Sequence, residues 1–484
     1  MILKVDENDN VAVALSRIIK GDTLPNVIAV DDIPIGHKIA LTQIAEGDKI
    51  IKYGSPIGSA TAEIEPGAFV HTHNIKTNLM GIEQYTYNPV TIQANYTASK
   101  SHFMGYKRPD GKVGIRNEIW IVNTVGCVNK IAEKLVSLTA AENVHTFVHP
   151  YGCSQLGEDH RFTQQILAAM VNHPNAAGVL ILGLGCENNH IDSFRTVLGE
   201  WDSDRVKFLN TQDVQDEIAE GLKLIDKLVE HAAKYTREPI PMSELIVGLK
   251  CGGSDGLSGI TANPLVGCFS DKLISHGGTS ILTEVPEMFG AETLLMGRAK
   301  DKVVFRKTVE LINNFKEYFV KHGQEIYENP SPGNKEGGIS TLEEKSLGCT
   351  QKGGNSYITD VLDYGEVVKT KGLNLLQGPG NDIVAVTNLM AAGAHMVLFT
   401  TGRGTPLGAP VPTVKISSNT ALAKLKPHWI DFDAGVLVSK NKKIDDLTLE
   451  FFNYLLSVAS GHIQTKNELN NYREISIFKD GVTL

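Results

Sequence analysis

A glycine-rich stretch with a thiol at its entrance is the first feature of the sequence that could do chemistry. The segment KCGGSDGLSGITANP begins at Lys250 and follows the apolar run LIVG. Glycines leave backbone N–H groups uncovered and let a ligand approach the main chain closely. We therefore predict a binding loop, with Lys250 as a candidate catalytic residue and Cys251 as a candidate metal ligand. The polar residues predicted to contact a substrate are Ser254, Asp255 and Ser258.

Five of the six cysteines lie where loops are expected. Cys127, Cys153 and Cys186 follow three successive strand-like runs, and ligands of parallel sheets bind just beyond the carboxyl ends of the strands. These three loops should therefore face one edge of one sheet. Cys251 follows a strand in the same way, and Cys349 is expected in a glycine-flanked loop. The thiols predicted to be metal ligands are Cys127, Cys186, Cys251 and Cys349. For any single one, the alternative is a small buried apolar side chain.

A second group of candidates is the motif HTHN, which contains His71, His73 and Asn74. On a strand, residues two apart point to the same face, so both imidazoles could bind one metal ion. Histidine suits Fe(II), Mn(II) or Zn(II), and the neighbouring amide could hold a substrate oxygen. We predict His71 and His73 as metal ligands and catalytic residues. The alternative is an ordinary surface pair.

Other glycine-flanked loops carry polar residues that could contact a substrate. Lys352 in CTQKGG is a catalytic candidate, and Asn381 and Asp382 in GPGND precede a predicted helix. A helix N-terminus of this kind can bind an anion. Arg403 in TTGRGTP could bind a carboxylate with two hydrogen bonds. The alternative for Arg403 is a structural salt bridge.

Composition excludes several classes of function. The formal net charge is −9, which argues against a large basic surface for nucleic acid. The apolar runs fall far short of the roughly 20 residues that a membrane-spanning helix needs. The start, MILKVDENDN, is polar and acidic, so we expect no signal peptide and a cytoplasmic protein. The motifs of dinucleotide, mononucleotide and nucleophile-elbow sites are missing.

The elements that must position these residues form an α/β protein of 484 residues. Short strands and turns predict a β-rich N-terminal domain over 1–84, with one helical stretch at Asn10–Lys20. A polar linker over 85–105 follows. Alternating strands and helices over 106–244 predict a second domain with a parallel sheet. A third, mixed α/β domain is expected over 245–484.

Several elements of the two larger domains can be assigned from periodicity. A long helix is expected over Lys302–His322, and Cys268 is expected to pack in the core from an amphipathic helix. The strands predicted for the second domain are Glu118–Thr124, Val144–His149, Ala177–Gly183 and Arg205–Asn210.

These residue types together indicate a metal-assisted enzyme that acts on a small polyhydroxylated anion. Glycine loops would supply backbone donors for hydroxyls, and the metal and Arg403 would supply charge for a carboxylate. The general base stays open at this point. The chemically able residues are His71, His73, His149, His160, Lys250 and Lys352.

The same motifs, in the same order, resemble those of the altronate/galactarate dehydratase family. They run the length of the chain and include IKYGSPIG, HTHN, TVGCVN, YGCSQLGEDH, GLGCENN, CGGSDGLSGITANP, KSLGCTQK and FTTGRGTP. The resemblance implies a small N-terminal SAF-type (β-clip) domain followed by two larger α/β domains with mainly parallel sheets. It also implies an iron(II)-requiring hydro-lyase that converts D-altronate to 2-dehydro-3-deoxy-D-gluconate in hexuronate breakdown. Mn(II) and an iron–sulfur cluster are the alternatives to Fe(II).

Two other readings stay open. The first is the same kind of reaction on another acid, as in the galactarate dehydratases and sulfolactate lyases of the wider family. The second, of a different class, is an iron–sulfur electron carrier that uses the loop cysteines. The long spacings between these cysteines and the many polar glycine loops argue against it. The partner expected is a small sugar acid, and a homodimer is expected from the size of the chain.

Overall fold

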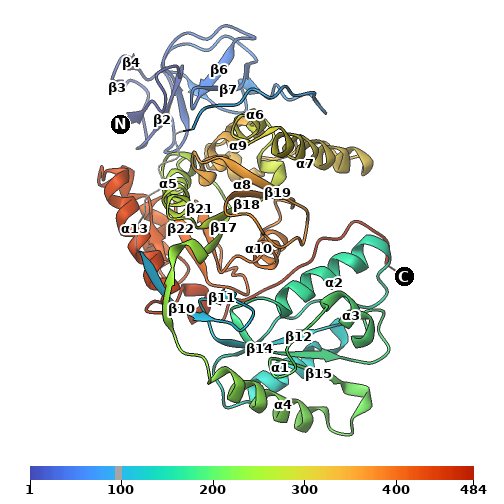
Figure 1. Cartoon of the computed structure of the whole chain (residues 1–484). Coiled ribbons are helices and arrows are strands. Elements are labelled where there is room, and N and C mark those ends of the chain that lie inside the picture. The colour runs from blue at the N-terminus through green and yellow to red at the C-terminus, as the bar shows by residue number, and fades with distance from the viewer. Residues whose placement is uncertain (93–100, 484) are drawn as a thin grey trace.

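The computed structural model describes residues 1–92 and 101–483 and divides into three parts along an elongated molecule (Figure 1). A small β-rich part lies at one end, a large α/β part lies in the middle, and a smaller α/β part lies at the other end. This arrangement confirms the predicted fold class. None of the described helices is both long and apolar enough to cross a bilayer.

The N-terminal domain consists of short antiparallel strands joined by turns. Its sheets have the strand orders β1-β2-β5-β8, β6-β7-β9 and β3-β4. The helix expected at Asn10–Lys20 is wrong, because this stretch contains strand β2 (Val11–Ala14), buried at every residue and paired with β1 and β5. Alternating Val and Ala suit a strand that is covered on both faces. The other strands are β1 (Ile2–Leu3), β3 (Thr23–Leu24), β4 (Val27–Ile28), β5 (Lys38–Ala40), β6 (Lys49–Lys52), β7 (Ser55–Ala60), β8 (Phe69–Val70) and β9 (Ile75–Lys76).

The chain then runs across the surface of the C-terminal domain. The hydroxyl of Tyr85 donates to Glu292 at 2.7 Å, and that of Tyr87 donates to the carbonyl of Ala299 at 2.8 Å. The first part of the predicted linker is therefore held down by hydrogen bonds. Its remainder includes residues 93–100, which lie outside the described part of the chain.

The second domain is built on a four-stranded parallel sheet with the order β13-β12-β14-β15. All four strands predicted from the sequence are confirmed, with small differences at their ends. The strands are β12 (Glu118–Asn123), β13 (Val144–Thr146), β14 (Ala176–Gly183) and β15 (Val206–Asn210). The helices are α1 (Asn129–Leu138), α2 (Gly157–Val171), α3 (Ile191–Leu198) and α4 (Glu217–Ala232). A small sheet with the order β11-β10-β16 joins this domain to the next; its strands are β10 (His102–Lys107), β11 (Val113–Gly114) and β16 (Glu238–Pro241).

The C-terminal domain contains a seven-stranded parallel sheet with the order β19-β20-β18-β17-β21-β22-β23. The strands are β17 (Ile246–Cys251), β18 (Thr279–Leu282), β19 (Ile358–Leu362), β20 (Gly372–Leu376), β21 (Met396–Thr401), β22 (Thr413–Ser417) and β23 (Phe432–Asp433). The helices are α5 (Ala262–Ser275), α6 (Glu292–Gly297), α7 (Lys302–Lys321), α8 (Pro332–Glu336), α9 (Leu342–Thr350), α10 (Asp382–Ala391), α11 (Thr420–Leu425), α12 (Val436–Ser439), α13 (Ile444–Ala459) and α14 (Lys466–Leu469). Helix α7 confirms the long helix expected there.

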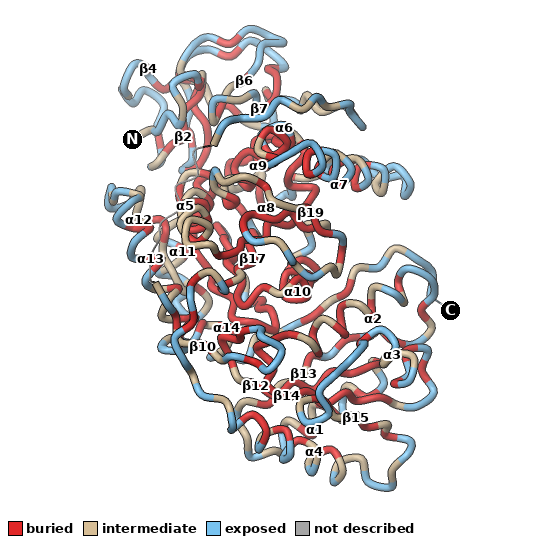
Figure 2. Tube along the Cα trace, in the orientation of Figure 1, coloured by how far each residue is buried: buried red, intermediate tan, exposed pale blue. Residues whose placement is uncertain are grey.

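The order of this sheet identifies the edge at which a ligand should bind. Strand β17 pairs with β18 on one side and with β21 on the other, so the chain changes direction across β17. In open α/β sheets, ligands bind beyond the carboxyl ends of the strands at such a switch point. The strands of the sheet are mostly buried, as Figure 2 shows, and the N-terminal domain lies next to α6 and α9 (Figure 1).

Candidate functional site

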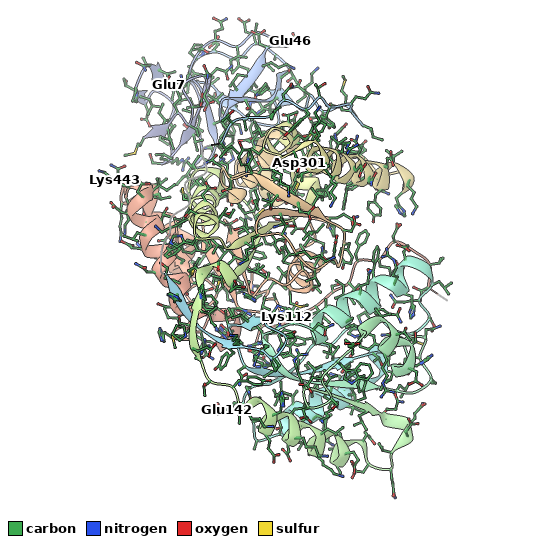
Figure 3. The ribbon with its side chains drawn as sticks, in the orientation of Figure 1. Glu7, Glu46, Lys112, Glu142, Asp301 and Lys443 are labelled. Atoms are coloured by element: carbon green, nitrogen blue, oxygen red, sulfur yellow. The ribbon has the colours of Figure 1, made fainter. Side chains whose placement is uncertain are left out.

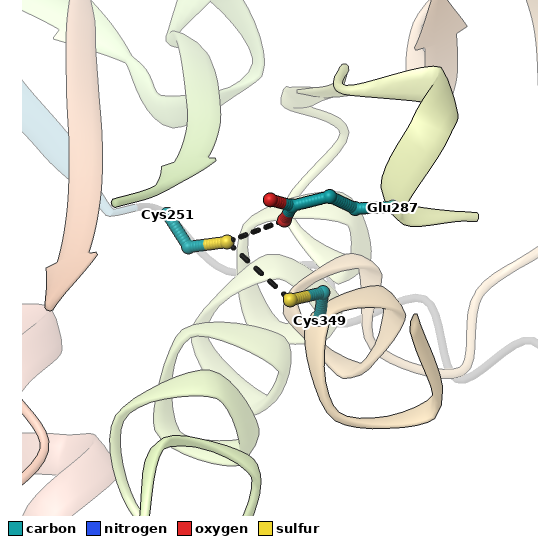
Figure 4. Close-up of side chains that lie close together, drawn as sticks. All are labelled: Cys251, Glu287 and Cys349. Carbon is teal, nitrogen blue, oxygen red and sulfur yellow. Dashed lines mark hydrogen bonds between the residues drawn. The ribbon is translucent and has the colours of Figure 1, made fainter. Parts of the chain in front are cut away.

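Two thiols and a carboxylate meet in the C-terminal domain beyond the end of β17. The Sγ atom of Cys251 lies 3.4 Å from the Sγ of Cys349 and donates to a carboxylate oxygen of Glu287 at 2.8 Å (Figure 4). Their ligand atoms all lie within 4.8 Å of one another, and all three residues are buried. Soft thiolates together with a carboxylate are ligands that a divalent transition metal accepts.

Three different elements supply these groups. Cys251 is the last residue of β17, and Glu287 lies in a 3₁₀ turn (Val285–Glu287) that follows β18. Cys349 was expected in a loop, but it lies in the last turn of α9. This helix ends at Thr350, just before the glycines that suggested a loop. Glu287 was missed because the sequence LTEVPEMFG has no metal-binding spacing.

Buried lysines and acids surround the thiols. The ammonium group of Lys250 contacts Glu284 and Asp382, and that of Lys345 lies 2.8 Å from Glu287. Lys352 lies 3.9 Å from Glu284. Burial lowers the pKa of Lys250, but Glu284 and Asp382 outweigh it, so the pKa is raised. Lys250 is therefore a charged group at neutral pH.

The cluster combines three lysines with three acids. Lys250, Lys345 and Lys352 lie against Glu284, Glu287 and Asp382. Burial, together with the nearby Cys251 and Glu287, raises the pKa of Glu284 well above its ordinary value. A hydrogen bond to Cys349, together with burial, raises the pKa of Cys251 well above its ordinary value. Binding of a metal would therefore release protons, and the residues present fit such an ion.

The N-terminal domain is docked beside this cluster by a buried ion triad. Both Lys38 and Lys52 lie 2.8 Å from the carboxylate of Glu344 on α9, and all three side chains are buried. Burial raises the pKa of Glu344, but the two lysines outweigh it and lower the pKa to about 2. The hydroxyl of Tyr53 lies against the backbone of Gly259 and Gly348. A Cβ atom on Gly259 would lie 2.2 Å from this hydroxyl, so no side chain would fit there.

A small cavity of about 10 Å³ lies between these groups and the thiols. Its lining includes Lys52, Tyr53, Ser254, Lys345 and Cys349. This is about the space that one water molecule needs. In the docked arrangement this cavity is therefore too small for a six-carbon acid.

The predicted histidine pair lies at the edge of the docked domain. The strand expected across His71 and His73 is instead a turn between β8 and β9, in which the Asn74 side chain bonds to the backbone of His71 and Phe69. The two imidazoles therefore do not share a strand face. His71 lies 3.1 Å from the hydroxyl of Ser340, whereas His73 is exposed and packs on Phe69.

His37, which the sequence analysis did not select, is buried beside His71. Its ring centroid is 5.1 Å from that of His71, and its Nδ1 lies 3.2 Å from the carbonyl oxygen of Ile35. Burial lowers the pKa of His37, and burial together with Lys38 lowers that of His71 to about 4. Both rings are therefore neutral at neutral pH and able to accept a proton.

The glycine-rich loop that follows Cys251 touches the N-terminal domain directly. A Cβ atom on Gly256 would lie 1.9 Å from the carbonyl oxygen of Gly36, so only glycine allows this approach. Asp255 accepts from the backbone N–H of Ser258 at 2.9 Å and from the hydroxyl of Ser418 at 2.8 Å. The Ser258 hydroxyl also donates to Asp255, and the backbone of Ser254 accepts from Asn334. The structure thus uses Asp255 and Ser258 to shape the loop.

A larger pocket of about 710 Å³ lies on the other side of Asp255, between the N-terminal and C-terminal domains. Its lining includes His37, Leu257, Arg403, Ser418 and Asn419. Pockets of this size hold small organic molecules. The guanidinium of Arg403 is half-exposed and lies 2.9 Å from the exposed carboxylate of Glu336. In the GPGND segment, Asn381 caps α10 and Asp382 contacts Lys250.

The remaining predicted ligands lie in the second domain. Cys127, Cys153 and Cys186 are exposed in the loops that follow β12, β13 and β14, and they are not part of the Cys251 group. His149 and His160 belong to this domain too, and His149 bonds to the carbonyl of Asn123 at 2.8 Å. Cys268 lies in α5, as expected, and is partly buried.

Comparison with known proteins identifies relatives of the whole chain. Family models described as the altronate/galactarate dehydratase SAF domain, the D-galactarate dehydratase/altronate hydrolase second domain, and the D-galactarate/altronate dehydratase C-terminal domain match residues 1–78, 105–233 and 242–483. Altronate dehydratases of Bacillus subtilis and Escherichia coli are 54% and 52% identical over 100% of this chain and 99% of their own lengths. A galactarate dehydratase (L-threo-forming) of Escherichia coli is 31% identical over 98% of this chain and 96% of its own length.

Proposed function

This chain belongs to the D-galactarate/altronate dehydratase family, and we propose that it is a hydro-lyase that removes water from D-altronate to give 2-dehydro-3-deoxy-D-gluconate. The observation that carries this proposal is the identity of more than half of all residues, over the full length, with two altronate dehydratases. The Cys251 cluster and the pocket of Arg403 supply the groups that such a reaction needs.

The charge of the pocket favours altronate over galactarate. Among the described residues that line it, Arg403 is the only lysine or arginine. One guanidinium pairs with one carboxylate through two hydrogen bonds. Altronate has one carboxylate, whereas galactarate has a second that would need another cation. We therefore assign Arg403 to the carboxylate of the substrate, which would displace Glu336.

We assign the general base to His37. Its Nδ1 can donate to the carbonyl of Ile35, and this hydrogen bond leaves the lone pair on Nε2. The neutral ring at the pocket can then take the proton from C2 of the sugar acid. His71, which lies beside it, holds the ring in place and limits the charge that the pair can carry. Lys250 and Lys352 are charged and buried, so their role is to balance the acids around the thiols.

The reaction balances without a redox partner. The proton on C2 goes to His37, the bond between C3 and its hydroxyl breaks, and the hydroxyl leaves as water with the proton that His37 carries. The enol that remains becomes the 2-keto product when its hydroxyl loses a proton and C3 takes one up from solvent. Arg403 stabilises the negative charge that develops next to the carboxylate as C2 loses its proton.

We assign the metal to Cys251, Glu287 and Cys349 and propose that it is Fe(II), with Mn(II) as the alternative. When bound, the ion supplies a Lewis acid for the departing hydroxyl and the developing enolate. Lys345 holds the carboxylate of Glu287, and Lys250 is paired with Glu284, so the protein groups around the thiols are already oriented.

The size of the inner cavity implies a moving domain. Since the space beside Cys349 holds about one water molecule, a sugar acid in the outer pocket can reach the thiols only when the N-terminal domain shifts. We propose that this domain acts as a lid, opening for the substrate and closing to exclude water.

Anaerobic turnover assays with Fe(II) test the proposal. We expect the chain to dehydrate altronate, with kcat/KM at least tenfold above that for galactarate, and to leave sulfolactate unchanged. Arg403→Ala should raise KM strongly, whereas Lys134→Ala, at an exposed position on α1 of the second domain, should not. Preference for galactarate or sulfolactate would overturn the substrate assignment. A dithionite-bleached chromophore without any dehydration would instead favour an electron carrier.

We also propose that the enzyme works in the cytoplasm as a homodimer. Size-exclusion chromatography with light scattering tests the oligomeric state.

A further inference from the structure

Three exposed cysteines stand together at one edge of the second domain, and the proposed function uses none of them. Strands β13, β12 and β14 are neighbours in a parallel sheet, so their carboxyl ends lie at the same edge. Cys127, Cys153 and Cys186 lie in the loops that leave these three strands, and all three thiols are exposed and free. Cysteine is among the residues most often buried, so three exposed thiols at one sheet edge call for a ligand.

Backbone hydrogen bonds tie the three loops together. The N–H of Gly126, next to Cys127, donates to the carbonyl of Tyr151 at 2.9 Å. The carbonyl of Gly152, next to Cys153, accepts from the N–H of Asn189 at 3.0 Å.

The backbones of these loops are closely packed against one another. A Cβ atom on Gly152 would lie 2.0 Å from the carbonyl oxygen of Thr124, and the φ angle of Gly152 is +98°. The backbone N–H of Ser154 also donates to the Asn188 side chain at 2.7 Å. The loops therefore hold their thiols in a fixed arrangement before any ligand binds.

Polar groups also stand next to the sulfur atoms. The amide of Gln212 donates to the Sγ of Cys186 at 3.6 Å, and the hydroxyl of Ser154 lies 3.8 Å from the Sγ of Cys153. Hydrogen bonds to sulfur are one means by which proteins adjust the potential of a bound cluster.

The spacing of the thiols distinguishes a cluster from a single ion. Three thiolates on one tetrahedral ion with metal–sulfur bonds of about 2.3 Å lie about 3.8 Å apart. Among the described residues, the sulfur atoms of Cys127, Cys153 and Cys186 do not form a group within 4.8 Å, whereas the Cys251 group does. The thiolates of a multinuclear cluster bind different iron atoms, so such a cluster does not require its sulfur ligands to lie that close together.

We propose that Cys127, Cys153 and Cys186 hold an iron–sulfur cluster, with one iron that no cysteine of the chain binds. An iron of this kind has an open position for water or for a hydroxyl or carboxylate oxygen. The site is separate from the Cys251 group and does not depend on the proposed function. The second domain lies at the far end of the molecule from the N-terminal domain (Figure 1).

Anaerobic reconstitution of the full chain with Fe²⁺ and sulfide tests the proposal. We expect about four acid-labile sulfide ions and about five iron ions per chain, one of the irons at the Cys251 group, and a visible absorption band that dithionite bleaches. Replacing all three cysteines by serine should remove the sulfide and the band. Cys268→Ser and Cys349→Ser should keep both, which separates this site from the one in the C-terminal domain. Absence of sulfide from the reconstituted wild type, or its full retention in the triple variant, would overturn the proposal.

Thiol alkylation of the wild type gives a second readout that does not depend on the variants folding. Without the cluster, iodoacetamide should modify Cys127, Cys153 and Cys186 rapidly, because all three are exposed. After reconstitution, mass spectrometry should show each of the three protected at least tenfold. Equal modification before and after reconstitution would contradict the assignment.

Discussion

Glu344→Gln is the change that most directly probes how the N-terminal domain is held. The substitution keeps the shape of the side chain but removes the negative charge between the buried ammonium groups of Lys38 and Lys52. Breaking a buried ion pair by removing one partner costs about 3–5 kcal/mol. The lowering of the Glu344 pKa from 4.5 to about 2 corresponds to about 3 kcal/mol, which agrees with that range.

The loss of about 3 kcal/mol should weaken the docking of the N-terminal domain on the C-terminal domain. The lysines belong to that domain and can return to water when it separates, so the variant should open more often. We expect amide hydrogen exchange at Asn78, whose N–H donates to Glu343 across the interface, to speed up by about a hundredfold, which is the ratio that about 3 kcal/mol gives. Exchange in the strands of the second domain should stay unchanged.

Glu46→Gln provides the matched control, because Glu46 lies on the outer rim of the N-terminal domain and is exposed (Figure 3). It should leave exchange within about twofold of the wild type, as surface changes do. If Glu344→Gln behaved like this control, the buried triad would not be what docks the domain, and the lid proposal would lose its physical basis.

Three further predictions follow from the same contacts. Acid should release the N-terminal domain of the wild type. The pKa of Glu344 is depressed in the folded state, so its contribution to docking stability is complete above pH 4.5 and is lost as the pH falls toward 2. Glu344→Gln should abolish this acid-induced step in hydrogen exchange. Gly256→Ala should undock the domain and lower turnover at least tenfold, because its Cβ would meet the carbonyl of Gly36 at 1.9 Å; Gly333→Ala, with nothing within 4 Å, should not, and equal behaviour of the two would refute the contact. His37→Asn should lower kcat by about 10²–10⁴-fold and remove the acidic limb of the pH–rate profile, and a kcat near that of the wild type would exclude His37 as the base.

The layered fold could be predicted from the sequence because its strands and helices have distinct local periodicities. Strand-like runs such as Ala177–Gly183 alternate with helical patterns, and the parallel sheet of the second domain follows from them. The short strand at Val11–Ala14 was mistaken for a helix, since four residues cannot establish a period. Its pairing with two other strands decides its conformation.

Only some residues of the candidate site could be predicted from the sequence. The strand-end rule selected Cys251, and the glycines after Cys349 selected that residue, although it lies at the end of a helix and not in a loop. Glu287, Lys38, Lys52 and Glu344 were missed because their meaning lies in contacts across hundreds of residues. A buried lysine cannot be told from a surface lysine by sequence spacing alone.

The most direct test of the account is an anaerobic crystal structure of the iron-loaded chain with altronate. We expect iron bound by Cys251, Glu287 and Cys349, and the carboxylate of altronate paired with Arg403. The N-terminal domain should be displaced from its position here enough to join the two compartments. Iron bound only outside this group, or altronate bound away from Arg403, would contradict the account.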